Sequence, residues 1–314
     1  MSLYLLPLAM PLPLLVAAAI AFPGRGRCPK RAGLAETAAL VSFLIAIGGL
    51  AVLVTQGAGT SSLIGAAGIG LSSLLDAVSV TMLLLVSFIG WLVLRYARTY
   101  LDGEARQGAF TGWLCLTLAA VLFFVQAGNL VQLAAAWIGM SMALRRLLLF
   151  YPERLAARRA ERKKRLFSRL GAAALIAGAG LVAWTYGTDD IATVNSIARA
   201  SGGSALTAVA AGLLAFAALL KSAQFPTHGW LTEVMEAPTP VSALLHAGIV
   251  NAGGFLLVRF ADVMLTAPGI LAAVAMVGGF TALFGALVML TQPAVKTSLA
   301  WSTVAQMGFM MLEC

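Results

Sequence analysis

Long apolar runs, separated by short polar or basic segments, recur along the whole chain. A helix of about 20 apolar residues is long enough to cross the roughly 30 Å hydrocarbon core of a bilayer. We find no alternation of apolar and polar positions of the kind that membrane strands require, so the runs predict helices. Ten spans are expected, at roughly 3–23, 34–55, 75–97, 109–127, 130–150, 169–187, 204–222, 239–260, 265–291 and 296–313.

Composition agrees with an all-α polytopic membrane protein and excludes a soluble domain. Hydrophobic residues make up 61% of the chain and charged residues only 11%, whereas soluble domains carry about 25% charged residues. The three cysteines and two histidines show no disulfide framework and no metal-ligand spacing. We therefore expect no cofactor in this chain.

The basic residues are clustered in a way that predicts the topology. Seventeen of the 21 lysines and arginines lie in the segments 25–31, 95–106 and 145–169, which follow the first, third and fifth predicted spans. Positive charge marks cytoplasmic loops, so the N-terminus is expected outside the membrane. The formal charge of +9 does not indicate nucleic-acid binding, because membrane spans separate the basic patches.

Three segments define the expected organisation. Residues 1–70 form a two-helix region, and residues 71–314 form the transmembrane core. Within that core, residues 151–168 are read as a basic cytoplasmic loop, either simply solvated near lipid headgroups or used to dock a partner. Residues 57–73 are rich in glycine and serine and predict an external loop. The tenth span ends in MGFMMLEC without a polar tail, as expected of one piece of a longer transporter.

Ionisable residues inside predicted spans are costly and therefore mark functional candidates. Lys221, His246 and Lys296 are the three that remain after residues near span ends are set aside. Each has a simpler interpretation as well: Lys221 as an anchor at the membrane edge, His246 as a packed, hydrogen-bonded histidine, and Lys296 as a lysine at the start of a helix.

Lys221 opens the stretch KSAQFPTHGW, in which Pro226 lies five residues further on. Proline removes a backbone donor and interrupts a helix, and transporters place ion sites at broken helices. The seventh span is therefore predicted to be broken. Supporting residues are expected nearby: His228 in the same stretch, Glu233 and Glu236 before the eighth span, and Asn251 five residues after His246.

Two long stretches carry a resemblance to a known family. KSAQFPTHGWLTEVMEAPTPVSALLHAG and QPAVKTSLAWSTVAQMGFM resemble the two signatures of the proton-translocating antiporter-like membrane subunits. That family includes the large membrane subunits of respiratory complex I, of Mrp-type cation/proton antiporters and of membrane-bound hydrogenases. The resemblance implies the antiporter-like fold, with its later helices missing here, and an ion path through Lys221, His246 and Lys296.

The chain also departs from the family pattern. The resemblance leads us to expect a glutamate directly after the tryptophan of the fifth span, but Ile138 follows Trp137. This departure, with the basic segment 145–169 and HAGIVNAGGFLLVRFADV, resembles the membrane subunit of Dab-type inorganic-carbon transporters. That resemblance implies a large cytoplasmic partner like a zinc β-carbonic anhydrase, so any zinc is expected on the partner.

The sequence is compatible with three functions. The first is a non-enzymatic subunit of the cell inner membrane that conducts protons or sodium ions to drive carbon dioxide hydration by that partner. The second is a proton-translocating subunit of an NADH-quinone oxidoreductase, a hydrogenase or an Mrp-type antiporter complex. The third is a fragment that serves only in assembly.

Overall fold

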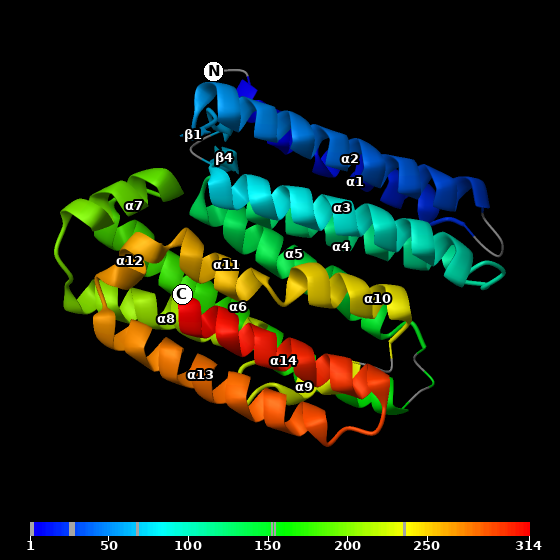
Figure 1. Ribbon diagram of the computed structural model, residues 1–314. Coiled ribbons are helices and arrows are strands. Elements are labelled where there is room, and N and C mark those ends of the chain that lie inside the picture. Colours follow the sequence, from blue (N-terminus) through cyan, green and yellow to red (C-terminus); the bar gives the residue numbers. More distant parts are fainter. Residues whose placement is uncertain (1–2, 25–28, 67–68, 152, 154, 235–236) are drawn as a thin grey trace. The chain divides into compact units, whose positions relative to one another are not determined.

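The computed structural model describes residues 3–24, 29–66, 69–151, 153, 155–234 and 237–314. The chain forms two compact units, Met1–Phe150 and Tyr151–Cys314, and each is built mainly of helices (Figure 1). From the sequence, a boundary is expected between residues 70 and 71, where the family resemblance begins. That boundary stays a prediction.

The first unit consists of helices joined by short loops and two small hairpins. Helix α1 packs against α2 and α4, and α3 packs against α2 and α4 as well. Its elements are η1 (Leu3–Ala9), α1 (Pro11–Ala21), α2 (Pro29–Gln56), β1 (Gly59–Thr60), β2 (Ile64–Ala66), β3 (Ile69–Leu71), β4 (Leu74–Leu75), α3 (Ala77–Tyr100), α4 (Gln107–Val125) and α5 (Leu130–Leu148).

The second unit is built around two closely packed helix pairs, α6 with α8 and α13 with α14. Helix α11 also lies against α8, and α9 lies against α6. The elements are α6 (Leu155–Tyr186), α7 (Ile191–Ala200), α8 (Ala205–Lys221), α9 (Gly229–Glu233), α10 (Thr239–Leu244), η3 (Leu245–Ile249), α11 (Ala252–Arg259), α12 (Ala261–Leu265), α13 (Pro268–Leu290) and α14 (Val295–Glu313).

Each of the ten predicted ranges contains helix, but fewer helices meet the length and hydropathy of a membrane span. Within the described part of the chain six do so, and α8 is apolar but shorter. The six are Leu3–Ala21, Lys30–Gln56, Ala77–Tyr100, Gln107–Val125, Arg158–Tyr186 and Pro268–Leu290. An all-α architecture suited to a membrane follows, while the number of ten spans stays a prediction.

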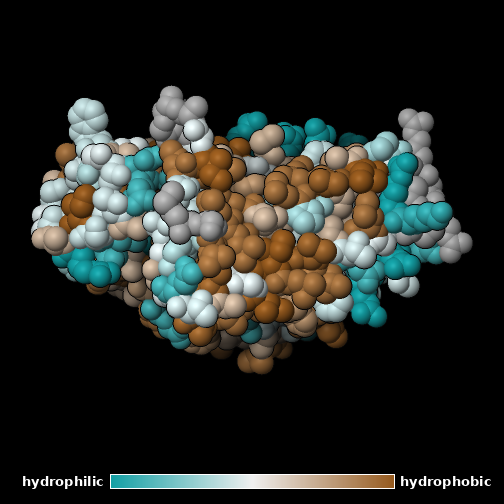
Figure 2. All heavy atoms as spheres, turned by 90° about the horizontal axis from the view of Figure 1, so that it is seen from above, coloured by the Kyte–Doolittle hydropathy of each residue, from teal (hydrophilic) through white to brown (hydrophobic). Residues whose placement is uncertain are grey.

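The surface of the first unit agrees with contact to lipid. Figure 2 shows a large brown, apolar area in the middle of one face, with teal, hydrophilic groups toward its edges. Large apolar side chains on α2 and α3 are exposed, and such a surface would be unfavourable in water. They include Val41, Leu44, Ile47 and Val54 on α2, and Leu85, Phe88 and Leu92 on α3.

The segment 57–73, expected to be an external loop, contains short strands. β1 pairs with β4 and β2 pairs with β3, both antiparallel. Asn129, which caps α5, also donates to the carbonyl of Gly70 at 3.0 Å and to the hydroxyl of Ser72 at 3.0 Å. Gln132 accepts from the backbone N–H of Ser72 at 2.9 Å. These bonds hold the hairpins to the start of α5.

The basic segment 151–168, expected to be a loop, is largely helical. Helix α6 begins at Leu155, well before the predicted span at 169. Alanine, arginine, lysine, glutamate and leucine dominate this segment, and all are strong helix formers. Glu161 and Arg165 form an i,i+4 ion pair, with 3.6 Å between carboxylate and guanidinium, which further supports the helix.

Glycines let α13 and α14 approach closely. A Cβ atom added at Gly278 would lie only 2.7 Å from the carbonyl oxygen of Gly308 on the opposite helix. A Cβ at the neighbouring Gly279 would lie 3.5 Å from Leu312, an ordinary contact distance. Small residues at such interfaces allow membrane helices to pack backbone to backbone.

We therefore predict that Gly278→Ala destabilises the protein, whereas Gly279→Ala does not. Overpacking of this kind costs about 1–3 kcal/mol, and the matched control carries the same change in helix propensity. The measurement is the midpoint of thermal unfolding of both variants in mild detergent. Equal midpoints would show that α13 and α14 do not depend on this close approach.

Candidate functional site

Lys221 is the last residue of α8 and lies at an interruption of the helical path. From Ala205 to Leu220 the helix carries no charge, and the Lys221 side chain is only 7% exposed. Residues 222–228, which include the exposed Pro226, are not helical, and α9 begins at Gly229. The helical path is therefore interrupted directly after a buried ammonium group. That this interruption lies within a membrane span stays a prediction.

The segment after Lys221 is fastened to the next helical stretch. The buried Ser222 donates its hydroxyl to the carbonyl of Val250 at 2.8 Å. A Cβ at Gly253 would collide with Ser222 and Ala218, so glycine is needed for α11 to reach α8. The end of α8 is thus held directly against the chain that follows His246.

His246 lies in η3, a turn that is wider than an α-helix. The N–H of Val250 donates to the carbonyl of Leu245 at 3.1 Å, which is the i→i+5 bond of a π-helix. Such turns occur inside α-helices and often mark functional sites. His246 is half-buried, and its Nδ1 is buried without a hydrogen-bond partner among the described residues.

Lys296 lies at the start of α14 and is exposed in this chain. Its ammonium donates to the carbonyl of Ala237 at 3.2 Å, which ties α14 to the segment before α10. Its charge acts electrostatically on His246. The structure therefore brings His246 and Lys296 into one electrostatic neighbourhood, without burying Lys296 as it buries Lys221.

His228 lies among aromatic rings from three segments. Its ring stacks on Phe225 at 5.7 Å between centroids and meets Phe284 of α13 at 5.5 Å and Trp301 of α14 at 5.1 Å. The Nδ1 atom of His228 is buried and has no hydrogen-bond partner among the described residues. The non-helical segment is thereby packed against α13 and α14.

The other predicted supporting residues have different surroundings. Glu233, at the end of α9, is half-buried and forms an ion pair with Lys163 of α6. Asn251 directly precedes α11 and is half-buried. Glu236 lies outside the described residues. Ile138, where the family pattern has an acid, lies in α5 of the first unit and is half-buried beside the buried Trp137.

Sequence reasoning missed two ionisable residues in the second unit. Glu161 is 5% exposed and Lys164 is 4% exposed, although both lie in the segment interpreted as a solvated loop. A signal was available. Lys164, Gly171 and Leu175 follow helical spacing, so extending the buried face of the apolar span toward the N-terminus would have included both residues.

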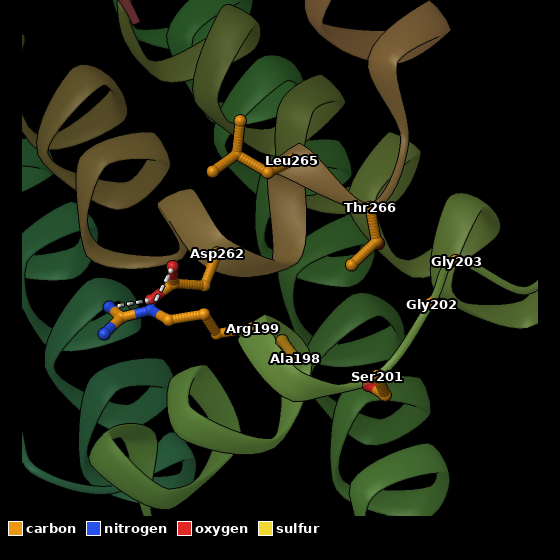
Figure 3. A pocket seen from close by; sticks show the side chains of 8 residues that line it. All are labelled: Ala198, Arg199, Ser201, Gly202, Gly203, Asp262, Leu265 and Thr266. Atoms are coloured by element: carbon orange, nitrogen blue, oxygen red, sulfur yellow. Dashed lines mark hydrogen bonds and ion pairs between the residues drawn. The ribbon is translucent and has the colours of Figure 1, made fainter.

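A surface hollow of about 300 Å³ lies at the α7–α12 end of the second unit (Figure 3). Arg199 of α7 donates two hydrogen bonds to Asp262 of α12, at 3.1 and 2.9 Å. Hydrogen bonding to Asp262 raises the pKa of Arg199. The pair is exposed on the arginine side, and exposed ion pairs contribute little to stability, so we interpret it as a tie between helices.

The described residues include no group of three or more histidine, cysteine, aspartate or glutamate side chains placed to hold a metal ion. The predicted site residues themselves offer ammonium, imidazole and carboxylate groups. The Ser222–Val250 bond joins the segments that carry Lys221 and His246, and the charge of Lys296 acts on His246.

Comparison with known proteins identifies similar chains. Over 239 residues the chain is 41% identical to the probable inorganic carbon transporter subunit DabB of Hydrogenovibrio crunogenus, covering 76% of this chain and 46% of the relative. It is 35% identical over 238 residues to NADH-quinone oxidoreductase subunit L of Mycobacterium tuberculosis, covering 76% of this chain and 37% of the relative. The chain thus spans less than half the length of these curated relatives.

A solved structure supports the fold. The Mrp complex from Dietzia sp. contains a chain that matches 98% of this chain and 34% of its own length, with a TM-score of 0.84 and 28% identity.

Two family profiles also match. Residues 62–111 match the N-terminus of complex I chain 5, described as NADH-ubiquinone oxidoreductase. Residues 127–314 match the transmembrane family described as NADH:quinone oxidoreductase/Mrp antiporter, and the chain belongs to that family of membrane proteins.

Proposed function

We propose that the chain is the ion-conducting membrane subunit of an energy-coupled complex that accumulates inorganic carbon in the cell. The observation that carries the proposal is the 41% identity to a probable inorganic carbon transporter subunit over three quarters of the chain. The residues proposed to conduct the ion are Lys221, His246 and Lys296. The chain is a transport subunit in this proposal and performs no catalysis itself.

The site geometry supports ion conduction through the second unit. An ammonium group buried at a helix break is held where its proton is costly to keep, so it can accept and release a proton. His246 follows on a wide turn with an unpartnered Nδ1, and imidazole exchanges protons near neutral pH. Lys296, at the start of α14, would pass the ion onward. Either protons or sodium ions fit the proposal at this level.

The partner is proposed to be a large cytoplasmic subunit that resembles a zinc β-carbonic anhydrase. It would hold the zinc, because no metal site is proposed in this chain. The α6 extension presents exposed basic side chains at Arg158, Arg159, Arg162 and Lys163, which would attract an acidic surface. Ion flow would drive one-way hydration of carbon dioxide to bicarbonate on that partner, at the cell inner membrane.

A second candidate is a proton-translocating subunit of a respiratory, hydrogenase or Mrp-type complex. The match to a chain of the Mrp complex at a TM-score of 0.84 favours it. The isoleucine that follows Trp137 favours the first candidate, because a standard redox-coupled subunit is expected to carry an acid there. Co-purification decides between them: a zinc-binding partner supports the first, and iron–sulfur subunits or further antiporter-like chains support the second.

Lys221→Ala is expected to abolish ion-coupled activity without preventing membrane insertion, because it removes the buried protonatable group. The measurement is growth at air levels of carbon dioxide of a carbonic-anhydrase-deficient host that expresses the complex. Arg199→Ala is the matched control and should grow like the wild type, since its ion pair is exposed. A fully active Lys221→Ala variant would show that Lys221 is only an anchor at the membrane edge.

His246→Ala is expected to reduce growth in the same host as strongly as Lys221→Ala. Removing the imidazole breaks the path between Lys221 and Lys296, while the η3 backbone can keep its geometry. Protein levels in the membrane fraction provide the control for folding. Unchanged growth would identify His246 as a packing residue.

Charge reversal at Arg159 and Arg162 is expected to weaken capture of the partner. Both side chains are exposed on α6, and attraction between surface charges is screened over about 10 Å at 0.1 M salt. The measurement is the amount of partner that co-purifies with Arg159→Glu/Arg162→Glu at low and at high salt. Arg199→Gln is the control, and a loss that does not depend on salt would argue against an electrostatic docking face.

A further inference from the structure

Glu161 and Lys164 on α6 are buried, although the two residues between them are exposed. Their exposed fractions are 5% and 4%, whereas Arg162 and Lys163 face solvent. Residues three apart lie on the same side of a helix. The first turns of α6 therefore have one water-facing basic side and one buried side that carries a carboxylate and an ammonium group.

The buried side of α6 faces α8, and the register between the two helices is defined by glycines. A Cβ at Gly171 would lie 3.7 Å from atoms of Ala217 and Leu220, and one at Gly178 would lie 3.2 Å from Leu213. The helices are thus antiparallel, with Gly171 opposite the end of α8. Lys164 is two turns before Gly171, about 10 Å along the axis.

The Lys164 side chain extends along α6 toward the level at which α8 ends. Its ammonium donates to the hydroxyl of Ser168, one turn closer to the end of α8, at 3.2 Å. The charge of Lys164 acts on Lys221, and the charge of Glu161 acts on Lys164. Glu161 also lies 3.6 Å from the guanidinium of Arg165. Two ammonium groups and one carboxylate are therefore gathered beside the helix break.

Two like charges held in one buried region repel each other strongly, because the effective dielectric there is low. The arrangement is therefore most stable when the two lysines do not both carry a proton at the same time. A carboxylate next to Lys164 stabilises the state in which that lysine is the charged one. Movement of a proton between the two amines would relieve the repulsion in either direction.

We propose that Lys164, which shares the buried side of α6 with Glu161, is the group that exchanges protons with Lys221 on the side where α6 begins. This inference rests on the proposed function and commits the conducted ion to the proton. In the transfer an N–H bond of the Lys164 ammonium breaks, and the lone pair of the neutral Lys221 amine forms the new N–H bond. The positive charge moves from α6 to α8, and neutral Lys164 regains a proton from hydronium in the adjoining water.

The test is proton flux into liposomes that contain the whole complex, measured with an enclosed pH-sensitive dye. Lys164→Met is expected to slow the flux by roughly 100-fold, as for removal of a positioned proton-transfer group. Glu161→Gln is expected to slow it as well, and Lys30→Met, at an exposed lysine on α2, should leave it unchanged.

Lys164→Arg separates proton exchange from a merely structural role. Arginine keeps the positive charge but does not release its proton in proteins, so the variant should be as slow as Lys164→Met. Restored flux with arginine would overturn the proposal. Ser168→Ala leaves the lysine in place and only frees its ammonium, so it should fold normally and show a smaller loss. Wild-type flux in Ser168→Ala would contradict the proposed orientation of Lys164.

The outcomes distinguish this inference from the proposed function. If the wild-type complex moves protons and Lys221→Ala stops them while Lys164→Met keeps the wild-type rate, only the role of Lys164 is refuted. If the wild-type complex moves no protons but carries sodium ions, the role of Lys164 is refuted and the proposed function stands. If the wild-type complex carries neither ion, both are refuted.

Discussion

The second unit depends on the burial of an ammonium group at the end of an uncharged helix. A charged side chain in a low-dielectric region is costly unless polar groups surround it. Ending α8 at Lys221 places the non-helical, polar segment 222–228 next to the charge. That segment must then satisfy its own backbone, which it does in part through the N–H of Phe225, which donates to the hydroxyl of Thr281 at 3.1 Å. The close approach at Gly253 follows from the same requirement.

The apolar runs were sufficient to predict where the helices lie, because membrane helices bury or expose apolar surface along their whole length. Pro226 likewise predicted the break after Lys221, since its effect on the backbone is local. The start of α6 was not predicted. Its charged residues suggest a solvated loop, and this outweighed the helical spacing that continues the buried face of the apolar span to Lys164.

The candidate site was predictable in its residues but not in its geometry. The amino-acid sequence around His246 does not indicate a π-turn, because that turn arises when one extra residue is accommodated in a packed helix. Lys296 was predicted either as part of the ion path or as a lysine at the start of a helix, and it is exposed at the start of α14. Side-chain burial depends on which helices cover a position, and the local sequence does not contain that information.

The structure bears on the acid that the family pattern leads us to expect at position 138. An acid at Ile138 would lie in the first unit, so its effect on Lys221 would depend on how the two units pack. Glu161 and Lys164 lie in the same compact unit as Lys221, and α6 packs directly against α8. A carboxylate within that unit can therefore influence the charge at the helix break whatever the placement of the first unit. The charge at the helix break therefore has a source of influence within the second unit that does not depend on the residue at position 138.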